Sequence, residues 1–74
     1  MMKPQDTQVL MALGILNFIS RNYVEASECF VLGIKENPTD HSLWNKFGAC
    51  MSNNMDLEQA VAAYEQALDL RPNY

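Results

Sequence analysis

Residues 43–72 read LWNKFGACMSNNMDLEQAVAAYEQALDLRP, and this stretch decides the fold. Its apolar residues recur at spacings of three and four, which indicates amphipathic helices. Asp40 is placed to cap a helix that runs to about Asn53, and Asp56 is placed to cap a second one. The second helix is expected to end before Pro72, because proline cannot continue an α-helix. The stretch therefore predicts a helical hairpin.

The hairpin pattern occurs twice, because Pro4, Pro38 and Pro72 are spaced 34 residues apart and a shift of that length aligns 7–40 with 41–74 without a gap. Small residues then match small ones and large residues match large ones, at Gly14/Gly48, Ala26/Ala60, Leu10/Trp44, Leu13/Phe47, Phe30/Tyr64, Gly33/Ala67 and Ile34/Leu68. Matched side-chain size at a fixed period is typical of stacked repeats. We expect one repeat at 7–40, a second at 41–74, and a leader at 1–6.

The first repeat is expected to divide as the second does, which gives an all-α chain of four antiparallel helices. Asp6 or Thr7 begins a helix to about Ser20, and Asn22 caps the next, with Glu25 three residues on as its capping-box partner. Asp56 has Gln59 at the same spacing.

Two glycines lie inside the expected helices. Gly14 and Gly48 each cost about 1 kcal/mol relative to alanine in a helix interior. Such a cost indicates close approach of a neighbouring helix, and we expect Ala26 and Ala60 to offer the facing small surface.

Composition excludes several classes of protein. The chain has 74 residues and a formal charge of −4, and its five basic residues are scattered, which argues against nucleic-acid binding. The longest apolar run, 9–19, is broken by Asn17 and is too short for a membrane span, so no membrane insertion is expected. The N-terminus does not read as a signal peptide. Cys29 and Cys50 are expected to be buried and reduced.

No enzyme chemistry is evident in the sequence. His41 is the one histidine and is expected to be a surface residue or cap neighbour. No cysteine or histidine cluster has metal-ligand spacing, and no glycine-rich phosphate loop is present. We expect a binding protein with no cofactor and no metal.

The spacing resembles the tetratricopeptide repeat, whose consensus is Trp-x2-Leu-Gly-x2-Tyr followed by Ala, Phe, Ala and Pro. The matching positions of the second repeat are Trp44, Phe47, Gly48, Met51, Ala60, Tyr64, Ala67 and Pro72. Those of the first are Leu10, Leu13, Gly14, Asn17, Ala26, Phe30, Gly33 and Pro38. The resemblance implies two tandem helix-turn-helix repeats from a superhelical solenoid.

A closer resemblance is carried by LWNKFGA at 43–49 and EQAVAAYEQALDLRPNY at 58–74. These segments look like the C-terminal repeat region of the receptors for type-1 peroxisomal targeting signals, at the fifth and sixth repeats. The resemblance implies a fragment of an import receptor that binds cargo ending in Ser-Lys-Leu or a variant. It also implies a location in the cytoplasm and the peroxisome, with membrane association during import.

The groove of such a solenoid is lined by the first helix of each repeat, and the inward stripe of the second repeat is Ser42, Asn45, Ala49 and Ser52, with Lys46 and Asn53 at its edges. An asparagine can both donate to and accept from a peptide backbone. The resemblance implies that Asn45 and Asn53 hold the cargo backbone, and that Lys46 favours its anionic end. The plain alternative is that these residues form a solvated helix face.

The first repeat departs from the receptors, which carry an asparagine where this chain has Phe18. Its inward stripe is Gln8, Met11, Ile15 and Phe18, and Asn17 should face the packing side. Either the helix shifts locally or one contact is lost. The apolar residues Met11, Ile15 and Phe18 either cover the terminal leucine of the cargo or pack structurally.

Two other binding functions are possible for helical repeats of this kind. A clamp for chaperone tails needs Lys and Asn where this chain has Met11 and Ile15, which argues against it. A general scaffold that docks a partner helix suits the apolar stripe. Two repeats also lack the neighbours that a longer array supplies to Val9, Leu10 and Leu13 on one side and to Tyr64 and Leu68 on the other. The fragment is therefore expected to self-associate or swap helices, and to bind cargo weakly.

Overall fold

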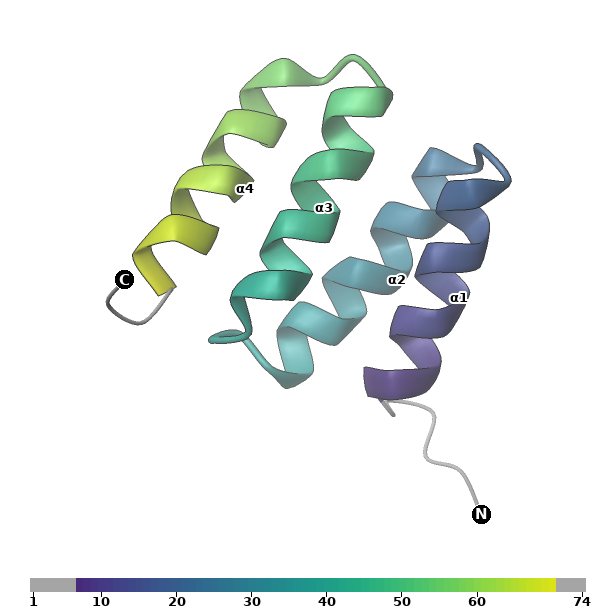
Figure 1. Cartoon of the computed structure of the whole chain (residues 1–74), viewed down its shortest axis with the longest axis horizontal. Helices are drawn as coiled ribbons and strands as arrows, with labels where there is room; N and C mark the ends of the chain where they lie inside the picture. The colour runs from purple at the N-terminus through teal and green to yellow at the C-terminus, as the bar shows by residue number, and fades with distance from the viewer. Residues whose placement is uncertain (1–6, 71–74) are drawn as a thin grey trace.

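The computed structural model describes residues 7–70 and consists there of four α-helices without strands. They are α1 (Thr7–Ile19), α2 (Tyr23–Glu36), α3 (His41–Asn53) and α4 (Leu57–Leu70). Figure 1 shows them side by side in chain order, with α2 and α3 at the centre. The expected leader at 1–6 lies outside the described residues. The all-α prediction of two tandem tetratricopeptide-type hairpins is confirmed.

Helix starts agree only partly with the expected caps. The Asp40 carboxylate accepts hydrogen bonds from the Ser42 N–H at 3.0 Å and from its hydroxyl at 2.8 Å. Asp56 accepts from the Gln59 N–H at 3.3 Å. Asn22 occupies the N-cap of α2 but makes no side-chain cap bond. Its ψ of 72° lies outside the extended region in which a cap side chain reaches the helix N–H groups, so the expected capping box there is wrong.

The turn inside each hairpin is a Schellman motif. Arg21 has a φ of 67° and donates its N–H to the Phe18 carbonyl at 3.0 Å, while Asn22 donates to the Asn17 carbonyl at 2.8 Å. The second hairpin repeats this with Met55 at φ 65° donating to Ser52 at 3.1 Å and Asp56 donating to Met51 at 2.8 Å. The two repeats therefore turn in the same way, with a non-glycine residue in the left-handed region.

Each mid-helix glycine lies against an aromatic ring of the second helix of its hairpin. A Cβ on Gly14 would lie 2.6 Å from Cε1 of Phe30, and one on Gly48 would lie 2.9 Å from Cε1 of Tyr64. Ala26 and Ala60 are buried too, but the atoms closest to the glycines belong to the rings, so the facing alanines stay a prediction. The missing Cβ makes room for the ring.

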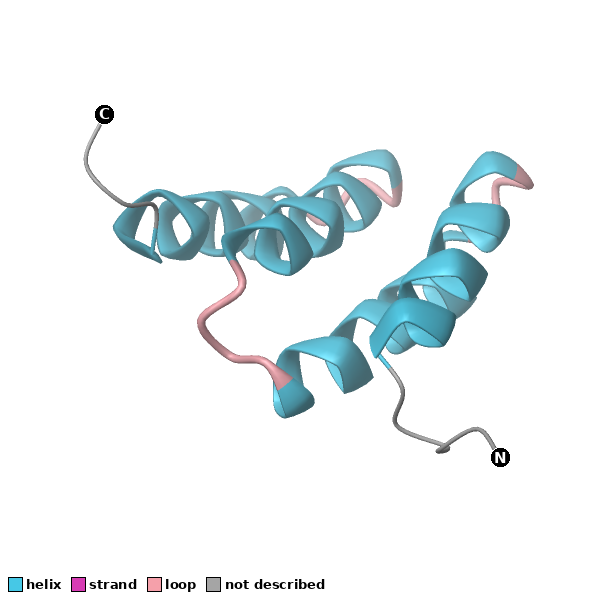
Figure 2. Ribbon diagram, turned by 60° about the horizontal axis from the view of Figure 1, so that its bottom comes forward, coloured by secondary structure: helices cyan, strands magenta, loops and turns pink. Residues whose placement is uncertain are grey.

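The core lies between the helices and continues from one hairpin to the next. Its buried cluster consists of Ala26, Phe30, Leu43, Cys50, Met51 and Ala60. Figure 2 shows the two hairpins inclined to each other and joined by the α2–α3 loop. The indole N–H of Trp44, on α3, donates to the carbonyl of Pro38 in that loop at 2.9 Å. No helix within residues 7–70 is long and apolar enough to cross a bilayer.

Candidate functional site

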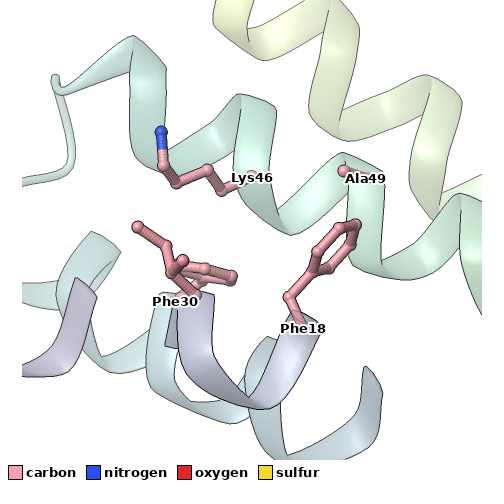
Figure 3. A pocket seen from close by; sticks show the side chains of 5 residues that line it. Phe18, Phe30, Lys46 and Ala49 are labelled. Atoms are coloured by element: carbon pink, nitrogen blue, oxygen red, sulfur yellow. The ribbon is translucent and has the colours of Figure 1, made fainter. Parts of the chain in front are cut away.

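A pocket of about 200 Å³ lies where three helices meet. It is lined by Ile15 and Phe18 of α1, Phe30 of α2, and Lys46 and Ala49 of α3. Figure 3 shows Phe18 pointing toward Ala49, while the Lys46 side chain lies along the same wall with its ammonium directed away from Phe18. The lining of the pocket is therefore apolar, with Lys46 contributing the carbon stem of its side chain.

Phe18 is held in place by its neighbours. Its ring meets the ring of Tyr23 edge-on, with centroids 5.4 Å apart and planes at 70°. This geometry is the favoured one for aromatic pairs. The side chain is half-buried and also packs against the core cluster, so Phe18 is a structural residue as well as a wall of the pocket.

Asn17 does not take the place of Phe18 in the pocket. Its amide donates to the Leu13 carbonyl at 3.0 Å, one turn back along the same helix. Because α1 is continuous from Thr7 to Ile19, the expected alternative of a local helix shift is not observed.

The remaining first-repeat candidates divide between the pocket and the core. Ile15 is 39% exposed and lines the pocket. Met11 is half-buried and packs against the core cluster, and it is not among the residues that line the pocket.

The asparagines predicted to bind peptide lie on α3 outside the pocket lining. Asn45 is exposed, and its side chain has no hydrogen-bond partner among residues 7–70. Asn53 is exposed and donates its amide to the Ala49 carbonyl at 2.8 Å. Ser52 is half-buried at the end of the helix. Of the α3 residues that the helical spacing predicts at the groove, Lys46 and Ala49 line the pocket. Asn45, Ser52 and Asn53 are not among the lining residues.

Phe30 is the pocket residue that the sequence reasoning missed. It matches a consensus position of the repeat, and the structure buries it to 1% exposure, but the sequence pattern does not place it at the groove. The sequence feature that could have identified Phe30 is its pairing with Gly14. A ring that packs against a glycine of α1 lies close to the neighbouring α1 residues, and Ile15 and Phe18 line the pocket together with Phe30.

The cysteines do not have the properties of nucleophiles. Both are free; Cys50 is buried as expected, whereas Cys29 is only half-buried. Burial raises the pKa of the Cys50 thiol to about 11, with a smaller contribution from Cys29. Burial, and then the Glu28 carboxylate, also raise the pKa of Cys29. Since the thiolate is the reactive form, both side chains are poorly reactive at neutral pH.

His41 is half-buried rather than on the surface, and its Nδ1 is enclosed without a hydrogen-bond partner in the part of the chain that the structure describes. Within residues 7–70 no group of three or more histidine, cysteine, aspartate or glutamate side chains is arranged to hold a metal ion.

The chain is similar in sequence to named receptors along almost its whole length. It is 33% identical over 69 residues, 93% of this chain, to the peroxisomal targeting signal receptor of Candida glabrata, and 32% identical over 69 residues to that of Saccharomyces cerevisiae. It is 41% identical over 59 residues, 80% of this chain, to the peroxisomal targeting signal 1 receptor of Dictyostelium discoideum. The alignments cover 12%, 11% and 9% of these proteins, so the chain spans about a tenth of their length. No protein-family model matches the chain.

Proposed function

This chain is homologous to one segment of the peroxisomal targeting signal receptors, and from that premise we propose that it forms part of a groove for the C-terminal peptides of peroxisomal cargo proteins. The peptides end in Ser-Lys-Leu or a close variant. The observation that supports this most is the pocket at the junction of α1, α2 and α3, where an apolar wall meets the Lys46 side chain.

The apolar wall receives the terminal side chain of the peptide. A branched aliphatic side chain at the end of the peptide would contact the carbon surface of Ile15, Phe18, Phe30 and Ala49. Full burial of such a side chain is worth about 1.5–3 kcal/mol. Met11 supports this wall from the core side. This contact supplies most of the affinity and selects for an apolar last residue.

The Lys46 ammonium binds the C-terminal carboxylate of the peptide. The carbon stem of this side chain lines the pocket while the ammonium lies beyond the apolar lining, and a pair with the peptide carboxylate at such a partly exposed position is worth up to about 1 kcal/mol. The charge therefore adds selectivity for a free chain end more than it adds affinity.

Asn45 and Asn53 bind the peptide backbone, with Ser52 at the edge of the groove. The Asn45 amide has no partner to give up within residues 7–70, whereas Asn53 must break its bond to the Ala49 carbonyl. A buried peptide amide that found no partner would cost about 1–3 kcal/mol, so these amides suit a ligand bound in extended form.

A titration of fluorescent peptides tests the proposal. A peptide ending in Ser-Lys-Leu is compared with its C-terminally amidated form, on the wild-type chain and on Lys46→Met. We expect Lys46→Met to weaken binding of the free acid by up to about fivefold and to leave the amide unchanged. Lys35→Met, in the last turn of α2, is the matched control and should bind like the wild type. Equal binding of acid and amide, or equal losses at Lys35 and Lys46, would contradict the proposal.

The wider role follows from the same premise. We propose repeats at 7–40 and 41–74 that act by binding, without catalysis and without a cofactor. The protein acts between the cytoplasm and the peroxisome and associates with the peroxisomal membrane during import.

The second candidate function is that of a general scaffold for a partner helix. The observation in its favour is an exposed apolar stripe on α4, formed by Leu57, Val61, Tyr64 and Leu68. We propose that this stripe makes the chain self-associate, either by stacking or by exchange of helices. Peptide binding that fails in the titration above, together with self-association, would favour the scaffold.

A further inference from the structure

Two aromatic rings line the pocket, and each is held by a contact of its own. The Phe30 ring lies against Gly14, where a Cβ would be 2.6 Å from its Cε1 atom, and only 1% of Phe30 is exposed. The Phe18 ring meets Tyr23 edge-on, with the centroids 5.4 Å apart. Because both rings are held before a ligand arrives, little side-chain entropy is lost when a ligand binds between them.

The side of the pocket that Phe18 faces is formed by small or slender groups. Phe18 points toward Ala49, which contributes a single methyl group, and Lys46 contributes its carbon stem (Figure 3). The space that remains is about 200 Å³. Pockets for whole small molecules are usually larger, at about 300–1,000 Å³. The pocket therefore suits one side chain of a ligand better than a complete small molecule.

The volume and the lining favour one class of side chain. An apolar cavity of about 150 Å³ is large enough for benzene, so a phenyl group fits the space beside Phe18 and Phe30. A leucine side chain is smaller and leaves part of the space unfilled, and unfilled space loses dispersion contacts. A third ring also makes edge-to-face or offset contacts with the two rings, which an aliphatic side chain cannot make.

We propose that this pocket binds an aromatic last residue of the peptide in preference to leucine, and that Phe18 and Ala49 determine the preference. The inference rests on the cargo function proposed above and narrows its ligands to peptides that end in a ring. Phe18 supplies the aromatic contact, and Ala49 leaves the room for the ligand. The aromatic contact alone should make a peptide ending in phenylalanine bind about two- to tenfold tighter than one ending in leucine.

A titration of two fluorescent peptides, one ending in Ser-Lys-Leu and one in Ser-Lys-Phe, tests the preference. Ala49→Val narrows the pocket, so it should weaken binding of the phenylalanine peptide about fivefold or more and affect the leucine peptide less. Ala62→Val is the matched control, because Ala62 is exposed on α4 and does not line the pocket. This control should keep the wild-type ratio of the two affinities.

Phe18→Leu removes the ring and keeps an apolar side chain at the same position. It should bring the two affinities close together, and circular dichroism checks that the helices are intact. A Phe18→Leu chain that keeps the wild-type ratio would overturn the role given to Phe18.

Two other results separate this inference from the cargo function. Leucine bound as tightly as phenylalanine by the wild type, or an Ala49→Val chain with the wild-type ratio, would overturn the aromatic preference and leave the cargo proposal standing. Failure of both peptides to bind the wild-type chain at millimolar concentration would overturn both proposals.

Discussion

Alanine at Gly14 is expected to destabilise the fold, whereas alanine at the equivalent Gly48 is expected to be neutral or stabilising. The new Cβ would lie 2.6 Å from the Phe30 ring in the first case and 2.9 Å from the Tyr64 ring in the second. Both distances require the ring to move. Phe30 is 1% exposed and is part of the buried core cluster, whereas Tyr64 is 37% exposed and can turn outward.

The magnitude follows from two opposing effects. Each substitution gains about 1 kcal/mol of helix propensity. At Gly14 the enclosed ring adds an overpacking cost of about 1–3 kcal/mol, so the net loss is about 0–2 kcal/mol. At Gly48 the ring moves into solvent at little cost, and most of the propensity gain of about 1 kcal/mol remains. The two variants should therefore differ by about 1–3 kcal/mol in free energy of unfolding.

Urea unfolding followed by circular dichroism measures this difference, at low protein concentration so that Tyr64 is not covered by another copy. The slope with urea should be the same for both variants, because they expose similar surface on unfolding. Gly14→Ala should also weaken peptide binding, since Phe30 lines the pocket, and Gly48→Ala should leave it unchanged. A Gly14→Ala chain as stable as Gly48→Ala would refute the account of how these helices pack.

Three further results are expected. Met55→Gly should stabilise the chain by up to about 1 kcal/mol, because glycine adopts the φ of 65° without strain, and a raised urea midpoint would show it. Asp40→Ala should lower the free energy of unfolding by about 1 kcal/mol, because the cap of α3 is lost. Asn22→Ala should lower it little, since Asn22 makes no cap bond. Comparable losses of stability in the two variants would contradict the observed caps. Iodoacetamide at pH 8 should modify Cys29 before the buried Cys50, and labelling of Cys50 first would contradict its burial. The free energy of unfolding should fall as pH rises from about 9 toward 11, because the Cys50 thiol ionises at a lower pH in the unfolded chain than in the folded one.

The helices could be predicted from the sequence because side-chain sizes recur after 34 residues, which is the length of one helical hairpin with its connection. Gly14 and Gly48 marked the places of closest approach, and Asp40 and Asp56 marked two of the helix starts. The Schellman turns could not be predicted, because Arg21 and Met55 stand where glycine is the usual signal.

Helical spacing could predict those residues of the candidate site whose position depends only on which face of their own helix they occupy. The spacing of α1 and α3 identified Ile15, Phe18, Lys46 and Ala49, all of which line the pocket. Phe30 was missed because its position depends on how α2 packs beneath α1, which no periodicity within one helix reveals.

The roles of the two asparagines stay predictions for a different reason. Asn45 and Asn53 are exposed on α3, and exposure is equally typical of a solvated face and of a binding residue. A ligand is needed to distinguish the two.

An amide NMR titration with a peptide ending in Ser-Lys-Leu, beside its amidated twin, tests the central claim most directly. The account predicts that the side-chain amides of Asn45 and Asn53 and the backbone amides of Ile15 and Ala49 shift with the free acid and much less with the amide. A well-dispersed spectrum that stays unchanged at millimolar peptide would contradict it, and the pocket of this chain would then not be a peptide site.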